Sequence, residues 1–171
     1  MARVPYVSPD DLDEEHRDML VSSFQDKPRN VYAALGNDPD VLAGMRSYFG
    51  SLWSHEGLTD REREILILTA AAEVDSAYER YQHENIAAGA GLSADEIEAL
   101  VDDDPEVFEE EEALLMAYCR AVVRGAVTDD LHERMVDAYG TDTTVVAANV
   151  GGAYLGLARV IDALGVEVED E

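Results

Sequence analysis

The segment from Thr59 to Ala72 constrains the fold of this 171-residue chain more than any other. Thr59 and Glu62 have the spacing of a capping box, in which each of the two side chains binds a backbone N–H of the other residue, so a helix is expected to begin here. Residues 65–72 are then apolar almost all round the helix, which is typical of a buried helix and not of a surface helix. We therefore expect a helix that crosses the interior of a helical domain.

The same helical punctuation recurs along the chain, and no segment shows sustained strand-like alternation. A second capping box begins at Ser93, and Gly165 has the character of a helix stop. The expected helices are 8–24, a short turn at 30–35, 39–53, 59–74, 76–91, and helices that begin at 93, at 104 (running through 106–112), at 128 and at 141. The sequence thus predicts one all-α domain, 1–171, of about seven to eight helices, with a helical N-terminal extension (1–36) and a frayed acidic tail (166–171).

The charge of the chain excludes several kinds of partner. Acidic residues outnumber basic residues 38 to 12, so the net charge is −26. This surface repels phosphates, and we expect neither a nucleic-acid nor a membrane partner. Lys27 is the sole lysine among the basic residues. Because molar salt shortens the Debye length to about 3 Å, such a surface suits a halophilic protein, with an ordinary acidic mesophilic protein as the alternative.

The N-terminus and the cysteine content indicate a cytoplasmic protein. Residues 1–25 hold no apolar signal-peptide core, so the sequence gives no reason to expect export. Cys119 is the one cysteine, which permits neither an internal disulfide nor a cysteine-based metal site.

Residues 145–164 are too apolar for an ordinary surface helix. Ala148, Gly152 and Gly156 recur at four-residue spacing, which allows another helix to approach closely. A membrane span is the alternative, but three polar residues interrupt the apolar run and leave it too short. A buried core helix or a subunit interface is favoured, and we expect a homo-oligomer.

The candidate site lies on the helical hairpin 59–91. Glu79 and His83 are one helical turn apart, and extending the apolar stripe of residues 86–90 backwards places both on the inward side. Glu64 precedes the turn by about as many residues as His83 follows it, so both reach a similar height. A buried Glu–His–Glu cluster is costly unless it is paired, and chemistry is one reason to keep it. The alternative is a solvated pair on a helix surface.

The surroundings of this cluster suggest substrate contacts and give little support to a metal. Tyr78 and Tyr81 flank the cluster, and together with Trp53 they are candidates for binding a small-molecule substrate, with plain packing as the alternative role. Two Glu and one His can bind a divalent ion, but the chain has no His-x-x-x-His or Glu-x-x-His pair. We expect neither a metal nor another cofactor.

At this hairpin the sequence resembles the carboxymuconolactone decarboxylase family, which includes the alkylhydroperoxidase D-like proteins. The residues that carry the resemblance are Leu58 to Leu68, Ser76 to Glu79, His83 and Ala88 to Ser93, with further likeness at Asn30 to Leu35 and Tyr154 to Gly165. The resemblance implies a helical bundle that assembles as a homo-oligomer, a trimer or hexamer with a dimer as the alternative, with the site near a subunit junction.

The peroxidase branch of that family carries a Glu, a Cys-x-x-Cys pair and a His. The resemblance places the Glu at Glu64 and the His at His83, while the cysteine positions fall at Ser76 and Glu79. Without thiols there, a disulfide relay is chemically excluded at this site. The decarboxylase branch lacks the cysteines and keeps a histidine, and its chemistry delivers a proton to an enolate-like carbon.

The resemblance leaves the substrate open. Arg80 stands where many relatives have Trp, and Leu155 where many have Asn, which indicates a rebuilt pocket. We expect an acid–base enzyme of the decarboxylase or lyase type on a small cyclic or carboxylated metabolite. In this hypothesis His83 transfers the proton, Glu79 orients and charge-tunes the His83 ring, and Glu64 is a second acid–base residue. The alternatives are an alkylhydroperoxidase or peroxiredoxin-like antioxidant protein, and a non-catalytic oligomeric ligand-binding protein.

Overall fold

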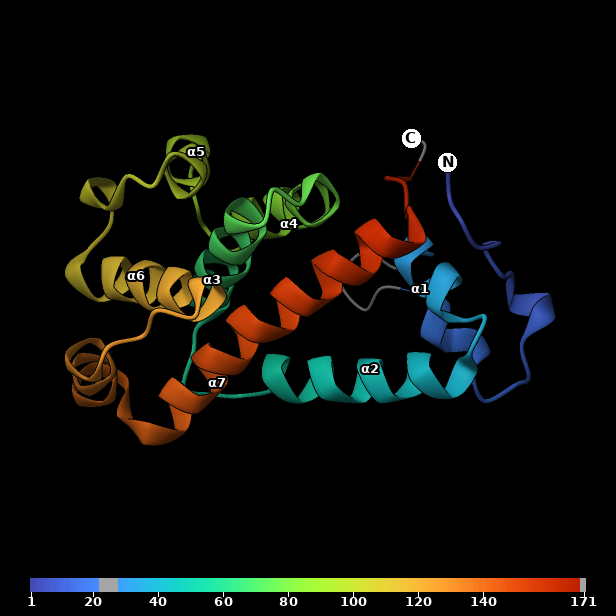
Figure 1. The fold of residues 1–171 in the computed structure, drawn as a ribbon, viewed down its shortest axis with the longest axis horizontal. Coiled ribbons are helices and arrows are strands. Elements are labelled where there is room, and N and C mark those ends of the chain that lie inside the picture. The colour runs from blue at the N-terminus through green and yellow to red at the C-terminus, as the bar shows by residue number, and fades with distance from the viewer. Residues whose placement is uncertain (22–27, 170–171) are drawn as a thin grey trace. The chain divides into compact units, whose positions relative to one another are not determined.

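The computed structural model describes residues 1–21 and 28–169, and the regular secondary structure of this part of the chain is helical (Figure 1). The elements in chain order are the 3-10 turns η1 (Pro9–Asp11) and η2 (Arg17–Leu20), the helices α1 (Asn30–Leu35), α2 (Pro39–Trp53), α3 (Asp60–Glu73), α4 (Ala77–Gly89) and α5 (Ala94–Asp102), the 3-10 turn η3 (Pro105–Val107), and the helices α6 (Glu110–Arg124) and α7 (Asp129–Leu164). The prediction of an all-α chain with about seven to eight helices is confirmed. The chain forms two compact units, residues 1–51 with 159–171 and residues 52–158, and each is described by itself.

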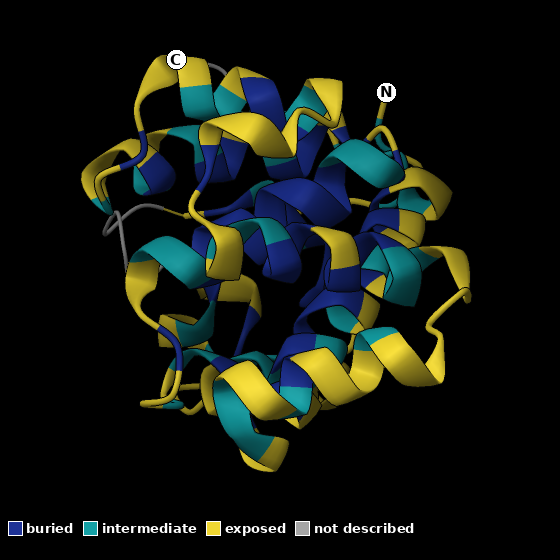
Figure 2. Cartoon of the chain, turned by 90° about the vertical axis from the view of Figure 1, so that its left-hand side faces the viewer, coloured by how far each residue is buried: buried dark blue, intermediate teal, exposed yellow. Residues whose placement is uncertain are grey.

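Helix α3 is the centre of the 52–158 unit. Its capping box forms as the sequence predicts, because Thr59 Oγ1 accepts from the Glu62 N–H and the Glu62 carboxylate accepts from the Thr59 N–H at 2.8 Å. Residues 63–71 of α3 are all buried, and Figure 2 draws the buried residues of the chain in dark blue. Helices α4, α5 and α6 all contact α3. The expected interior helix is therefore present.

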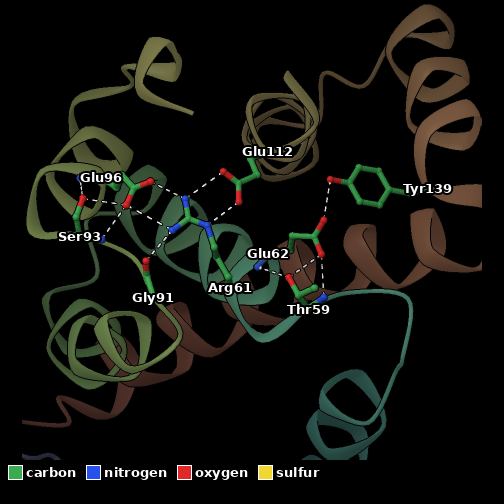
Figure 3. Close-up of polar contacts among 8 residues, drawn as sticks. All are labelled: Thr59, Arg61, Glu62, Gly91, Ser93, Glu96, Glu112 and Tyr139. Atoms are coloured by element: carbon green, nitrogen blue, oxygen red, sulfur yellow. Dashed lines mark hydrogen bonds and ion pairs between the residues drawn. The ribbon is translucent and has the colours of Figure 1, made fainter. Parts of the chain in front are cut away.

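A network of hydrogen bonds and ion pairs around Arg61 connects α3 to α5 and α6 (Figure 3). The Arg61 guanidinium donates to both Glu112 carboxylate oxygens, at 2.7 and 3.1 Å, and to Glu96 Oε1 at 2.5 Å. It also donates to the Gly91 carbonyl at 2.9 Å. Hydrogen bonding to Arg61, followed by the Ser93 backbone, lowers the pKa of Glu96 to about 2. One planar cation thus joins the starts of two helices to a third.

A second ionic group joins the end of α3 to α6. The Glu73 carboxylate accepts from both Arg120 and Arg124. Burial by itself would raise the pKa of Glu73, but the hydrogen bonds from Arg124 and Arg120 outweigh it and hold that pKa below its ordinary value. Arg120 also donates to the Leu100 carbonyl of α5 at 2.7 Å.

Helix α7 contains a break at Gly140, whose φ of 78° and ψ of 165° are not helical. The first segment is tied to the start of α3 by the Tyr139 hydroxyl, which donates to Glu62 Oε1 at 3.0 Å (Figure 3). Among the described residues, α7 is the one helix that is long and apolar enough to cross a membrane, judged by length and composition only. Buried core helices pass the same test, and 39 % of the most apolar 18-residue window of α7 is buried.

Within the described chain, Gly152 and Gly156 of α7 do not make the close helix contact that the sequence predicts for them. A side chain at Gly152 or Gly156 would meet nothing within 4 Å. The close approach is instead made at Gly151, where a Cβ would lie 3.3 Å from Val122 Cγ1 and 3.4 Å from Cys119 Sγ of α6. The homo-oligomer expected from this stripe stays a prediction.

The expected helix 8–24 is wrong over its described part. The Ser8 N–H donates to Asp11 Oδ2 at 2.7 Å and the 3-10 turn η1 begins after Ser8, but the backbone becomes extended at Leu12, and the short 3-10 turn η2 comes only at Arg17. Residues 22–24 lie outside the described residues. The physical reason is sparse burial, because Leu12 and Leu20 are the buried apolar side chains of residues 8–20, and they are too far apart to form a helical stripe.

The expected helix beginning at Asp104 is also different. Asp104 Oδ1 accepts from the Glu106 N–H, but the 3-10 turn η3 ends at once and Phe108 is extended and buried. Helix α6 begins only at Glu110, with Glu109 at its N-cap. Burying the Phe108 ring therefore divides the segment in two.

The unit of residues 1–51 with 159–171 joins the chain's two described ends. The Arg3 side chain donates to the Asp162 and Ala163 carbonyls at 2.7 and 2.8 Å, which caps the end of α7. Glu167 pairs with the N-terminal ammonium at 2.7 Å, and Glu169 accepts from the Asn30 N–H at 2.7 Å. The sequence predicts a frayed tail over 166–171, whereas residues 166–169 are anchored by these contacts.

Candidate functional site

The hairpin of α3 and α4 supplies the three ionisable residues of the candidate site. Helix α3 ends at Glu73 with Val74 as its C-cap, and Asp75 turns the chain with a left-handed φ of 54°. Ser76 then caps α4, its Oγ accepting from the Glu79 N–H at 3.4 Å. The turn therefore lies where the sequence predicts, and this fixes the register of His83 against Glu64.

The site itself is a histidine between two carboxylates. His83 Nδ1 lies 3.0 Å from Glu64 Oε2 and 3.2 Å from Glu64 Oε1, a hydrogen-bonded pair. His83 Nε2 lies 3.7 Å from Glu79 Oε2, which is ion-pair range but longer than a hydrogen bond. Each ring nitrogen thus faces a different carboxylate.

All three residues are buried. Glu64 is fully buried, while Glu79 retains 3 % and His83 retains 7 % of its surface. Because unpaired charges are costly in such a place, the pairing of the imidazole with Glu64 is what makes the burial tolerable. The solvated surface pair, which the sequence left as the alternative, does not describe this geometry.

Two aromatic side chains contact the His83 ring. The Trp53 indole stacks on the imidazole with ring centroids 6.2 Å apart and planes 20° apart. The Tyr154 ring meets it edge-on, at 5.3 Å and 84°. Trp53 Nε1 also donates to the Tyr154 hydroxyl at 3.4 Å. The imidazole is therefore bounded by rings from the end of α2 and from α7.

The other expected aromatic residues take different positions. Tyr78 is buried, whereas Tyr81 is exposed. Tyr154, which the sequence analysis placed only within a stretch of likeness, belongs to the site. The signal that could have found it is a phenol on the inward face of an otherwise apolar helix, four residues after the buried Val150.

The thiol needed for peroxide chemistry is absent from the positions where the resemblance places it. Those positions hold Ser76 and Glu79. Cys119 is fully buried in α6, its Sγ donates to the Leu66 carbonyl at 3.2 Å, and burial raises its pKa to about 12. A thiol in this state is neither a nucleophile nor a metal ligand near neutral pH.

No group of three or more His, Cys, Asp or Glu side chains within residues 1–21 and 28–169 has an arrangement suited to a metal ion. What the cluster can do chemically is move a proton. A carboxylate that holds one imidazole nitrogen leaves the other nitrogen to accept or donate a proton.

Comparison with solved structures identifies the fold of the chain. A peroxidase-related protein from Ralstonia eutropha JMP134, described as an alkylhydroperoxidase AhpD core, matches with a TM-score of 0.85 at 19 % identity, over 99 % of this chain and 93 % of its own. The debrominase Bmp8 matches with a TM-score of 0.84 at 12 % identity, over 98 % and 91 % of the two chains. A protein of unknown function from Agrobacterium tumefaciens matches with a TM-score of 0.72 at 20 % identity, over 80 % and 95 %.

Sequence comparison gives a family for the central segment. No curated protein sequence matches the chain significantly. Residues 39–114, which include α3, α4 and all three ionisable residues of the site, match the model of the carboxymuconolactone decarboxylase family. The resemblance seen in the sequence is thereby confirmed: residues 39–114 carry the pattern of the carboxymuconolactone decarboxylase family, and the chain has the alkylhydroperoxidase D-like fold.

Proposed function

We propose that this protein is an acid–base enzyme of the decarboxylase or lyase type that acts on a small cyclic or carboxylated metabolite. The observation that carries the proposal is the buried imidazole of His83, whose two nitrogens lie 3.0 Å from Glu64 and 3.7 Å from Glu79. The family pattern over residues 39–114 supports the same reading.

Glu64 is the residue that orients the histidine in this proposal. Its carboxylate holds Nδ1 at 3.0 Å and is itself fully buried, so it favours the tautomer with a proton on Nδ1 and holds that side of the ring in place. The sequence hypothesis gave this role to Glu79, but Glu79 lies beyond hydrogen-bond distance from the ring. The distances therefore favour an exchange of the two roles.

His83 Nε2 is the atom that transfers the proton, and Glu79 is the second acid–base. At 3.7 Å, Glu79 Oε2 can pass a proton to or from Nε2 after a small side-chain movement or through one water molecule. A substrate atom that lies beside this pair could approach both groups.

In a decarboxylation the bond between the carboxyl carbon and the adjacent carbon breaks, and carbon dioxide leaves. The electron pair stays with the substrate as an enolate, and protonated His83 donates the Nε2 proton to its carbon. Solvent then returns a proton to the imidazole, directly or through Glu79. Other lyase reactions that generate an enolate need the same proton donor.

Peroxide reduction is not favoured by the same residues. It requires a thiolate that is oxidised and a second thiol that resolves it. Ser76 and Glu79 occupy the two motif positions, and Cys119 is buried with a pKa of about 12.

Trp53 offers a direct test, because it is the sole tryptophan of the chain and it stacks on His83. We expect small lactones and β-keto acids that occupy the site to change the fluorescence of Trp53. Release of carbon dioxide or loss of the lactone absorbance should follow for true substrates. Both measurements belong in molar salt, given the charge of −26.

The variants His83→Gln and Glu64→Gln should abolish turnover, with His132→Gln as a matched control. His132 also hydrogen-bonds a buried group, the Tyr118 hydroxyl at 3.2 Å, but it lies outside the cluster. Saturable binding without any turnover would replace the proposal by a ligand-binding protein. Full turnover by His83→Gln would contradict the proposed mechanism.

A further inference from the structure

The contacts of His83 reach beyond the two carboxylates to two rings that no acid–base role requires. Trp53 covers the plane of the imidazole, and Tyr154 meets it nearly at a right angle. Both contacts fall within the 4.5–7 Å range of favourable aromatic pairs. The hydrogen bond from Trp53 Nε1 to the Tyr154 hydroxyl links the two rings to each other.

Trp53 is itself held in place from α3. The Arg63 guanidinium lies 5.0 Å over the indole ring. Arg63 is buried, and it donates to the His55 and Leu58 carbonyls at 3.0 Å each and to Asp60 at 2.8 Å. These hydrogen bonds hold the Arg63 guanidinium in place, and the cation–π contact then restrains the indole of Trp53.

Adjacent residues of α3 therefore act on the imidazole by separate routes. Glu64 binds Nδ1 directly, while Arg63 acts through the indole of Trp53. A hydrogen bond at one nitrogen does not by itself set the plane of an imidazole ring. The stacked Trp53 ring and the edge-on Tyr154 ring both restrict that plane.

We propose that Trp53 and Tyr154 form an aromatic clamp, supported by Arg63, that positions the His83 ring so that Nε2 stays directed to Glu79. In this proposal Trp53, which the sequence predicts to bind substrate, is also a positioning residue, and so is Tyr154. The effect on turnover rests on the proposed function, whereas the effect on the imidazole does not. Displacing a catalytic group by about 1 Å can lower the rate on the order of 100-fold, so loss of the clamp should have a measurable effect on turnover.

The test is nuclear magnetic resonance of the His83 ring in the full chain, with histidine labelled and His83→Gln used for assignment. In Tyr154→Leu the imidazole signals should lose their ring-current displacement and broaden, because the ring samples several orientations. Trp53→Leu removes the other half of the clamp and should do the same, so the test survives if one variant does not fold. Tyr154→Phe keeps the ring and should leave the His83 signals close to those of the wild type.

Tyr118→Leu is the matched control, since Tyr118 is also buried and its hydroxyl also contacts a histidine in the 52–158 unit. It should leave the His83 signals unchanged. On a substrate found by the fluorescence assay, Tyr154→Leu should lower kcat about 10- to 100-fold with little change in KM.

Unchanged His83 signals in folded Tyr154→Leu and Trp53→Leu would overturn the clamp. Disordered His83 signals together with unchanged kcat would support the clamp and contradict the proposed role of His83. The two proposals therefore fail by different results.

Discussion

Replacing Arg61 by Met removes the guanidinium and keeps most of the apolar stem. The variant loses the bonds to Glu96, Glu112 and the Gly91 carbonyl, and leaves two carboxylates facing a site without its cation. A lysine ammonium cannot make the bidentate bond that the guanidinium makes to Glu112. Arg61→Lys should therefore keep only part of the stability that Arg61→Met loses.

The magnitude follows from the Glu96 carboxyl group. Its pKa falls from 4.5 to about 2, chiefly through Arg61 and then through the Ser93 backbone. At about 1.4 kcal/mol per pKa unit the whole effect is at most about 3 kcal/mol. The part of this pKa shift that comes from Ser93 is kept in the variant. The side chains of Arg61 and Glu96 are 26 % and 21 % exposed, so solvent screening reduces the stabilisation by Arg61 further. Counting Glu112 as well, we expect Arg61→Met to lose about 2 kcal/mol of unfolding free energy.

Urea unfolding followed by the fluorescence of Trp53 measures this loss at constant molar salt and pH 7. With an m value of about 2 kcal/mol per M, the midpoint should fall by about 1 M while m stays constant. Arg124→Met is the matched control, because Arg124 is more than half exposed and its partner Glu73 retains Arg120. Its midpoint should move much less.

The pH dependence gives an independent check. A carboxyl group with a lowered folded-state pKa stabilises the protein above its unfolded value, and this stability is lost as pH falls through the folded value. The difference between wild type and Arg61→Met should therefore be full above pH 4.5 and shrink as pH falls toward 2. Equal midpoints for Arg61→Met and Arg124→Met, or a difference that grows below pH 4.5, would show that Arg61 does not stabilise the fold through Glu96.

Four further predictions concern the core and the surface. Thr69→Val should raise the melting temperature, because the buried Thr69 Oγ1 has no hydrogen-bond partner among the described residues; a lower melting temperature would contradict this. Cys119 should resist iodoacetamide at pH 8 in the native state and react only in urea, as its pKa of about 12 requires, and fast native labelling would be the contrary result. Gly152→Ala should stabilise the chain by about 0.5–1 kcal/mol, whereas Gly151→Ala should gain less because Val122 and Cys119 crowd the new methyl group; calorimetry that ranks them in reverse would count against the packing. The melting temperature should also climb between 0.01 M and molar salt, where the Debye length falls from about 30 to 3 Å, and a flat curve would reject the halophilic interpretation.

The parts of the fold that could be predicted are those in which a local signal and burial agree. Thr59 has a capping box followed by a continuous apolar run, and α3 forms as expected. Ser8 also stands at an N-cap, with its N–H bound to Asp11, yet only three residues of 3-10 turn follow it, because no apolar stripe binds a longer helix to the core. A cap therefore marks where a helix can begin and says little about whether it continues.

The candidate site shows the same division. Helical period and the position of the turn predict that Glu64, Glu79 and His83 converge, and they do. Which carboxylate hydrogen-bonds the ring depends on the difference between 3.0 Å and 3.7 Å, and the spacing of residues along the chain does not contain such detail. Tyr154 contacts His83 from a distant helix, and such long-range packing leaves no local pattern to read.

Glu62 and Glu96 each bind a helix cap and a remote side chain at the same time. Glu62 caps α3 through Thr59 and accepts from Tyr139, while Glu96 caps α5 through Ser93 and pairs with Arg61 (Figure 3). The first turns of α3 and α5 therefore cannot open without also breaking contacts to other helices. Helix ends ordinarily fray and exchange their amide hydrogens quickly, but these two should exchange only when much of the 52–158 unit unfolds cooperatively.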